Sequence, residues 1–326
     1  MTGQLQISQA APPKTADRGR AAVAAAVTVV LWASAFVAIR AIGPSLSPAP
    51  MALVRLAVAA AALSVLVLAS RRRIPRLLPP RRTVALVAVY AVLWLAGYTV
   101  VLNAAERQVD AGTAALLVNT APLLIAFGAG LFLREGYPRP LIVGSLVALG
   151  GVAVIAAGST GHRDWMGIVL CVLAALLYAA GVLVQKVTLR RVDGLVAIWL
   201  GCLIATAVLL PWLPQLLAEL RTAPIGAVLG TVYLGLFPTA IGFTTWAYAL
   251  RRMDAGRLSA TTYAAPAVSV VLSWLLLAET PTVYGLVGGV ICLVGVAISR
   301  RRPEAVVAPA VARSTRDGSG RGSVGV

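Results

Sequence analysis

The chain has 326 residues, of which 60% are hydrophobic and only 12% are charged. A soluble globular protein carries about 25% charged residues, so this composition excludes an ordinary soluble domain and indicates an integral membrane protein. The net charge of +17 would suggest nucleic acid in a soluble protein, but here the basic residues stand at the ends of apolar runs and indicate topology instead. We therefore expect a small-molecule substrate and the lipid bilayer as partners, and no nucleic acid.

The chain begins with a polar segment, residues 1–20, and then alternates apolar runs with short polar connections. Each run can cross a hydrocarbon layer that requires about 20 helical residues, although two of them are short. Continuous apolar runs exclude the alternating strands of a membrane barrel. The sequence therefore predicts an all-α integral membrane protein with ten transmembrane helices. The predicted spans are 21–43, 49–69, 83–104, 112–133, 139–157, 165–185, 195–217, 225–249, 257–278 and 282–299.

The second half of the chain repeats part of the first. Residues 105–153 align without a gap on residues 249–297, with 16 identities in 49 positions, and the matched Arg, Asp, Pro and Glu residues are the informative ones. Such a duplication in a membrane protein is typical of transporters built from two half-bundles around a central site. We expect a five-helix repeat at 21–157, a second at 158–299, and a disordered cytoplasmic tail at 300–326.

The basic residues predict how the chain crosses the membrane. If the N-terminal tail of residues 1–20 is cytoplasmic, the inner segments hold 23 Lys and Arg residues and the outer segments hold 4. This bias places both termini in the cytoplasm of a multi-pass protein of the plasma (inner) membrane. Five helices per repeat is an odd number, so the two repeats are expected to be inverted relative to each other.

Several stretches carry a family resemblance. The first span holds Trp32-Ala-Ser-Ala-Phe, the second holds Arg55-Leu-Ala, and both repeats hold an Ala-Pro pair followed by Glu and a Gly-Val-Ala run. In this order, and duplicated, they resemble the EamA-type members of the drug/metabolite transporter superfamily over about residues 21–299. The resemblance implies a ten-helix alternating-access carrier, most often an exporter of metabolites, amino acids or drugs. It also implies that Trp32 and Ser34 belong to the substrate site.

Two prolines occupy equivalent positions in the repeats. Pro122 and Pro266 fall near the middle of the fourth and ninth predicted spans. A proline removes a backbone hydrogen bond and kinks a helix, so the pair predicts either hinges beside the cavity or static kinks. Asn119 and Tyr263 lie one turn before the prolines, and polar groups at this depth are expected to face the bundle interior. They are candidate cavity-lining residues, with interhelical hydrogen bonding as the alternative.

Aromatic and amide side chains concentrate on the third and eighth spans. In a cavity they would suit an apolar or aromatic solute, whereas near helix ends they would form an interfacial belt. The candidates are Trp94, Tyr98 and Asn103 on the third span and Trp246 and Tyr248 on the eighth.

Arg40 and Arg55 are the charges that need an explanation. Arg55 lies about 9 Å inside the second span, counted from its outer end. Its side chain could snorkel outward, pair with Glu106 or Asp110, or contact an anionic group on the solute. These three interpretations remain open at the level of sequence.

The positions of the acidic residues limit the mechanism. All 11 stand at helix ends, in loops or in tails, which argues against proton-coupled export of cationic drugs, because a proton relay normally needs an intramembrane carboxylate or histidine. The polar groups present suit a neutral, zwitterionic or anionic solute better. Cys171, Cys202 and Cys292 lie in apolar runs and predict neither disulfides nor a metal site. We expect no cofactor.

The best functional hypothesis is a secondary transporter, and two alternatives remain. One is a translocator of lipid or lipid-linked headgroups with the same fold. The other is a membrane-embedded enzyme, which we do not expect because no acid pair, metal cluster or Ser/His arrangement occurs at depth. The sequence leaves open whether the chain forms a homodimer.

Overall fold

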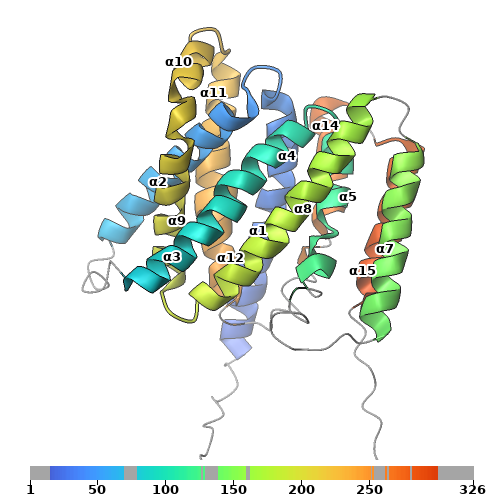
Figure 1. Cartoon of the computed structure of the whole chain (residues 1–326), viewed down its shortest axis with the longest axis horizontal. Coiled ribbons are helices and arrows are strands. Elements are labelled where there is room, and N and C mark those ends of the chain that lie inside the picture. The colour runs from blue at the N-terminus through green and yellow to red at the C-terminus, as the bar shows by residue number, and fades with distance from the viewer. Residues whose placement is uncertain are drawn as a thin grey trace, which may run out of the picture.

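The computed structural model describes residues 15–69, 79–125, 128, 139–158, 162–250, 252, 261–262, 264–279 and 281–299. Within these ranges the fold is helical and contains no strand, and the long helices run side by side in one bundle (Figure 1). In the first half the elements are α1 (Thr15–Ile42), α2 (Pro48–Ala69), α3 (Arg81–Tyr90), η2 (Ala91–Tyr98), α4 (Thr99–Ala105), α5 (Ala111–Val118) and α7 (Arg139–Ala157). In the second half they are α8 (His162–Thr188), α9 (Gly194–Leu209), η3 (Leu210–Trp212), α10 (Leu213–Leu220), α11 (Ile225–Leu234), η4 (Gly235–Ile241), α12 (Gly242–Leu250), α14 (Ala264–Leu277) and α15 (Val283–Ser299).

The helices have the length and composition of membrane spans. In the described part of the chain, six are at least 18 residues long and apolar enough to cross a bilayer, and four apolar helices are shorter. Many large apolar side chains point outward, among them Leu66 and Leu68 on α2 and Leu275 and Leu276 on α14. A soluble protein rarely exposes so much contiguous apolar surface. Such faces are suited to contact with lipid. The prediction of an all-helical membrane protein is confirmed.

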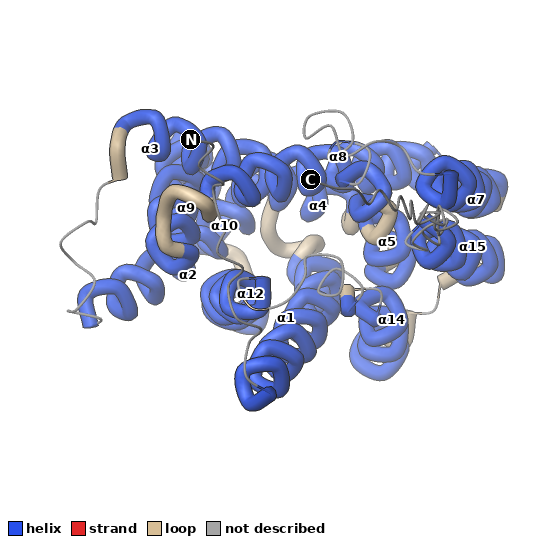
Figure 2. Tube along the Cα trace, turned by 90° about the horizontal axis from the view of Figure 1, so that it is seen from below, coloured by secondary structure: helices blue, strands red, loops and turns tan. Residues whose placement is uncertain are grey.

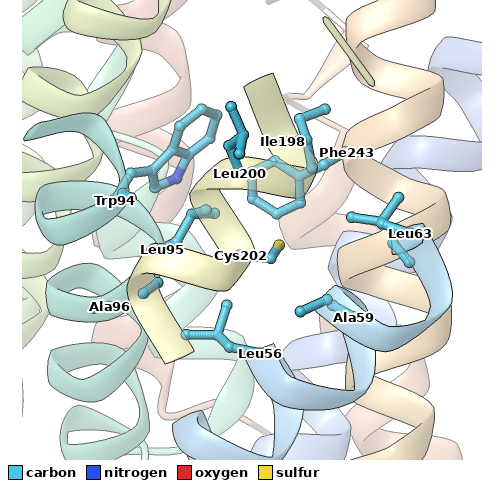
Figure 3. Packing of buried hydrophobic residues seen from close by; sticks show 14 of the residues in the cluster. Leu56, Ala59, Leu63, Trp94, Leu95, Ala96, Ile198, Leu200, Cys202 and Phe243 are labelled. Atoms are coloured by element: carbon cyan, nitrogen blue, oxygen red, sulfur yellow. The ribbon is translucent and has the colours of Figure 1, made fainter. Parts of the chain in front are cut away.

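The largest buried cluster lies where α2, α9, η2 and α12 meet. Trp94 and Leu95 from η2 point toward α9, and Phe243 from α12 lies beside them, as Figure 3 shows. Leu56 and Leu63 of α2 close the opposite side of the cluster. Because these elements come from both halves of the chain, this packing joins the two halves into one body.

Helices α7 and α15 form a separate pair at one end of the bundle (Figure 2). They approach so closely that a side chain added at Gly151 would come within 2.5 Å of the carbonyl oxygen of Gly288. A side chain at Gly295 would come equally close to the carbonyl oxygen of Gly144. Small residues are the usual means of close helix contact in membranes. These contacts run in opposite directions along the two helices, so the pair is antiparallel.

Both proline-containing spans differ from the continuous helices expected at 112–133 and 257–278. Helix α5 ends at Val118, and a turn at Asn119 and Thr120 precedes the helical residues that contain Pro122. Helix α14 begins at Ala264, which places Pro266 in its first turn. A proline is well tolerated there because the first-turn N–H groups have no partner within the helix. The prolines thus follow helix boundaries, and they are not in the middle of regular helices.

Candidate functional site

Two π-helical segments shape the centre of the bundle. The segment η2 covers Ala91–Tyr98 and η4 covers Gly235–Ile241, and their first residues are 144 positions apart, which is the offset of the sequence repeat. A π-helical turn inside an α-helix is rare and is frequent at functional sites. Each segment widens its helix at the same place in the repeat. Trp94 and Tyr98 of η2 line one central cavity, and η4 holds two other lining residues, Trp32 and Arg55, by hydrogen bonds.

The central cavity has a volume of about 60 Å³ in this conformation. Its wall is supplied by α1, α2, η2, α4, α5, α8, α12 and α14 and by residues beside them. The residues of the wall are Trp32, Ala35, Phe36, Arg55, Trp94, Tyr98, Thr99, Leu102, Val118, Asn119, Pro122, Tyr178, Phe243, Thr262 and Ala265. Ligand pockets typically measure about 300–1,000 Å³, so a solute of that size requires the helices to move apart.

Aromatic rings make up one side of the cavity. The Trp94 ring stacks on Tyr178 with centroids 5.1 Å apart and meets Phe243 edge-on at 4.9 Å. The Trp32 ring lies 5.4 Å from Phe243, and Tyr98 lies 5.7 Å from Tyr178. Such contacts are each worth about 0.5–1.5 kcal/mol beyond simple burial. The result is a rigid apolar surface built from helices of both halves of the chain.

Arg55 supplies the positive charge of the cavity wall. Its side chain is only 5% exposed, and its Nε donates a hydrogen bond of 2.8 Å to the Oγ1 of Thr239. Its Nη1 is buried and has no hydrogen-bond partner among the described residues. A buried guanidinium with an unpaired donor is energetically costly, because burial removes the hydration that the charge had in water.

A proline explains why Thr239 is available to Arg55. Pro238 has no N–H, so an α-helical pattern would leave the carbonyl of Leu234 without its donor. The Oγ1 of Thr239 donates to that carbonyl at 2.8 Å and accepts the hydrogen bond from Arg55. Trp32 donates from Nε1 to the carbonyl of Pro238 at 3.2 Å. The irregular backbone of η4 therefore holds both the cation and one of the aromatic rings.

The expected site residues divide into two groups. Trp32, Trp94, Tyr98, Asn119 and Arg55 line the cavity, as does Pro122. The Nδ2 of Asn119 donates to the carbonyl of Ala115 at 2.9 Å, which secures the end of α5. Pro266 is buried in the first turn of α14, next to the lining residue Ala265. Tyr263 lies outside the described residues.

The other candidates lie away from the cavity wall. Ser34 forms a 2.7 Å hydrogen bond with the hydroxyl of Tyr233 and borders a separate groove. Trp246 packs against Trp32, with ring centroids 5.0 Å apart, and does not line the cavity. The ring of Tyr248 lies under the guanidinium of Arg252, at 3.6 Å.

Asn103 is fully buried and ties α4 to α2. Its Nδ2 donates to the carbonyl of Pro48 at 2.9 Å, while its Oδ1 has no described partner. The side chain therefore joins two helices at one end of the bundle, and it is not among the residues that line the cavity.

Arg40 takes part in an ion pair instead of facing the cavity. Its Nε donates to the carboxylate of Glu279 at 3.0 Å, and its Nη1 donates to the carbonyl of Glu106 at 2.8 Å. The pair of Arg40 with Glu279 is the one ion pair in which both partners are described residues. This cluster links the last turn of α1 to the segment between α14 and α15.

The carboxyl group of Glu106 is buried beside this cluster. Its side chain is 1% exposed, and neither oxygen has a hydrogen-bond partner among the described residues. Burial raises the pKa of Glu106 well above its ordinary value, and the positive charges of Arg40 and Arg55 offset only part of that rise. Asp110 and Glu279 raise it further. The sequence places this residue at a helix end, and only the fold shows that it is enclosed.

Nine lining residues were absent from the sequence-based candidates, and Phe243, Thr99 and Thr262 are among them. Phe243 and Thr99 are 144 residues apart and hold equivalent repeat positions on α12 and α4. Extending the repeat alignment of residues 105–153 on 249–297 by six residues toward the N-terminus would have paired them. Thr262 and Val118 are also 144 residues apart, and both line the cavity, so the repeat could have identified this pair too.

The comparisons with known proteins agree on one family. The model of the EamA-like transporter family matches the chain twice, over residues 19–157 and 165–301. A protein of Streptantibioticus cattleyicolor named "Probable terminal-alkyne amino-acid exporter" is 38% identical over 87% of this chain and 94% of its own length. An uncharacterized transporter of Bacillus subtilis, YdfC, is 34% identical over 82% of this chain and 86% of its own length.

A more distant relative and a solved structure extend the likeness. The uncharacterized inner membrane transporter YedA of Escherichia coli K12 is 28% identical over 77% of this chain and 81% of its own length. A crystal structure shares the fold with a TM-score of 0.60 at 21% identity, covering 86% of this chain and 97% of that one. The likeness to that structure concerns the fold alone.

Proposed function

The chain belongs to the EamA-like transporter family, and from this premise we propose that it exports a small organic solute by alternating access across the plasma membrane. The observation that carries the proposal is the central cavity, whose wall combines aromatic rings, polar groups and one arginine from both halves of the chain. Secondary transporters place their substrate site at the junction of two repeats near the middle of the bilayer. The named relatives are transporters, which points away from an enzyme.

The proposed substrate class is a metabolite, an amino acid or a drug-like molecule. The relative from Streptantibioticus cattleyicolor bears the name of an amino-acid exporter, which supports an amino acid among these candidates. Rings such as Trp94 and Phe243 suit an apolar or aromatic part of the solute. Trp32, Tyr98 and Asn119 complete the proposed contacts.

We propose that the protein consists of two inverted five-helix repeats, residues 21–157 and 158–299, with both termini in the cytoplasm. The packing of α7 against α15 supports inversion. Gly151 contacts Gly288, and Gly144 contacts Gly295, so each contact has a counterpart at positions displaced by 144 residues. Antiparallel contact between equivalent helices is what a twofold axis in the membrane plane produces.

Alternating access requires the outer end of the cavity to open and close. The ion pair between Arg40 and Glu279 joins elements of the two proposed repeats, and the small cavity volume of about 60 Å³ fits a closed conformation. We assign the breaks before Pro122 and Pro266 as the hinges, because helix ends absorb changes of backbone angle more easily than helix interiors.

Transport is tested in two steps. Untargeted metabolite profiling of a deletion strain against an overproducing strain should identify solutes that accumulate inside the first and outside the second. Purified protein in proteoliposomes should then transport those solutes with saturable kinetics. If no solute differs between the strains, and none crosses in proteoliposomes, the transporter proposal fails.

A further inference from the structure

The guanidinium of Arg55 has an unused donor in the wall of the central cavity. Its Nε is held by Thr239 and its Nη1 has no partner among the described residues, although the side chain is almost fully buried. Buried cations in proteins are normally paired, because an unpaired one loses its hydration without compensation. The anchoring through Nε leaves the outer nitrogens to meet an anion, and a guanidinium binds carboxylates with two parallel hydrogen bonds.

None of the nearby carboxylates forms an ion pair with the Arg55 guanidinium in the described structure. Glu106 attracts Arg55 electrostatically, but no ion pair joins them within the described structure. Glu279 is bonded to Arg40, and Asp110 accepts hydrogen bonds from the backbone and hydroxyl of Thr113. The cation that faces the cavity therefore keeps its capacity for an external anion.

The rest of the wall limits what that anion can be. Arg55 is the one charged side chain among the described lining residues, and none of them is acidic. A single guanidinium matches one carboxylate, whereas a phosphate monoester carries about −1.5 to −2 charges and would leave part of its charge uncompensated. An ammonium group on the solute would meet no counter-ion in this wall, and only the ring faces could attract it.

On the basis of the proposed transport function, we propose that the Arg55 guanidinium binds the carboxylate of a monocarboxylic acid whose flat apolar body packs against Trp32, Trp94 and Phe243. The polar side chains of Asn119 and Thr99 stand in the same wall and offer further hydrogen bonds to the solute. Recognition depends on the carboxylate and does not require an ammonium group.

Matched ligands test the proposal on the wild-type protein. The probes are benzoate, 3-phenylpropanoate and indole-3-acetate, each with its primary amide, together with phenylalanine, phenethylamine and phenyl phosphate. Binding is measured by isothermal titration calorimetry on protein in nanodiscs of zwitterionic lipid. At least one carboxylate should bind about ten- to a hundredfold more tightly than its amide, which is the effect of a charge-assisted hydrogen bond. Phenethylamine should bind as weakly as the amides.

Several outcomes overturn the proposal. They are the absence of a carboxylate preference in all three pairs, binding of phenethylamine as tight as 3-phenylpropanoate, and binding of phenyl phosphate tighter than every carboxylate. None of these comparisons needs a variant, so a variant that fails to fold does not affect the result.

Variants then assign the preference to one residue. Arg55→Gln should remove the difference between a carboxylate and its amide, and Arg55→Lys should retain part of it, because lysine keeps the charge and loses the planar pair of donors. Arg221→Gln, in the exposed turn before α11, is the matched control and should bind like the wild type. An unchanged preference in Arg55→Gln overturns the assignment.

The transport proposal and this proposal fail in different ways. If carboxylates bind through Arg55 but no solute crosses in proteoliposomes, the transport function is wrong and the binding site stands. If solutes cross at equal rates in the wild type and in Arg55→Gln, the transport function stands and the role of Arg55 is wrong.

Discussion

Ala148 and Cys292 hold equivalent positions in the duplicated sequence, 144 residues apart, and they touch each other. The thiol of Cys292 donates to the carbonyl oxygen of Ala148 at 3.3 Å. When equivalent residues of two antiparallel helices meet, an axis of twofold symmetry passes between them. The contact therefore supports the proposed inversion of the repeats through packing, independently of the count of basic residues.

The glycines on this interface allow a direct comparison of neighbouring positions. A methyl group at Gly151 would come within 2.5 Å of the carbonyl oxygen of Gly288, whereas one at Gly150 would meet nothing within 4 Å. Gly151→Ala should lower the free energy of unfolding by about 1–3 kcal/mol through overpacking. Gly150→Ala should be neutral or stabilising by up to about 1 kcal/mol. Thermal unfolding in detergent checks both, and equal destabilisation by the two variants would contradict the close contact.

Thr239 is expected to be more important than an ordinary helical threonine. Thr239→Val removes the acceptor of the Arg55 Nε hydrogen bond and the donor to the carbonyl of Leu234. Because the buried Arg55 guanidinium then loses a hydrogen bond, the free energy of unfolding should fall by about 1–3 kcal/mol. Thr206→Val is the control, because the hydroxyl of Thr206 donates to the Cys202 carbonyl of its own helix at 2.7 Å. Equal unfolding midpoints for the two variants would contradict the role of Thr239.

The ion pair of Arg40 with Glu279 should contribute little to stability. Both side chains are about one-third exposed, at 30% and 31%. Exposed pairs typically contribute about 0.2–1 kcal/mol, so a double-mutant cycle with Arg40→Gln and Glu279→Gln should give a coupling energy in that range. If the pair closes the outer end of the cavity, both single variants should alter the transport rate more than they alter the unfolding midpoint. Unchanged transport in both variants would contradict a gating role.

Glu106 should make stability depend on pH. Burial raises the pKa of Glu106 above its ordinary value of 4.5, so the folded protein retains this proton at pH values where the unfolded chain has lost it. Stability from this group is therefore fully present below pH of about 4.5 and is lost as the pH rises through the raised pKa. Arg40 and Arg55 limit the effect by favouring the ionised form, while Asp110 and Glu279 oppose them.

The measurement is the thermal unfolding midpoint of the purified protein between pH 4.5 and pH 9. Glu106→Gln, which stays neutral, should reduce the decline with rising pH. Glu219→Gln is a matched control on α10, where the carboxylate accepts a hydrogen bond from the backbone N–H of Ser47, and it should retain the decline of the wild type. A decline of equal size in Glu106→Gln would show that other groups cause it.

Much of the fold could be predicted from the sequence. Apolar runs of about 20 residues predict helices in lipid because no other isolated element satisfies its own backbone hydrogen bonds there. The duplication predicted which segments are equivalent, and the structure places the π-helical segments η2 and η4 at that same offset. Pro122 and Pro266 were predicted as hinges or static kinks within continuous helices. The helix boundaries before them were not predicted, because a proline indicates an interrupted hydrogen bond and does not show where the helix ends.

The composition of the cavity wall was decided by tertiary structure. In a soluble helix the apolar stripe identifies the buried face, but a membrane helix is apolar on all sides, so the pattern does not show which residues face the interior. Ser34 and Tyr248 therefore looked as eligible as Trp32 and Trp94, and the fold turns only the latter two toward the cavity. The contact of Arg55 with Thr239 joins residues 184 positions apart. Sequence alone determined a duplicated helical membrane protein, whereas packing decided which side chains meet at its centre.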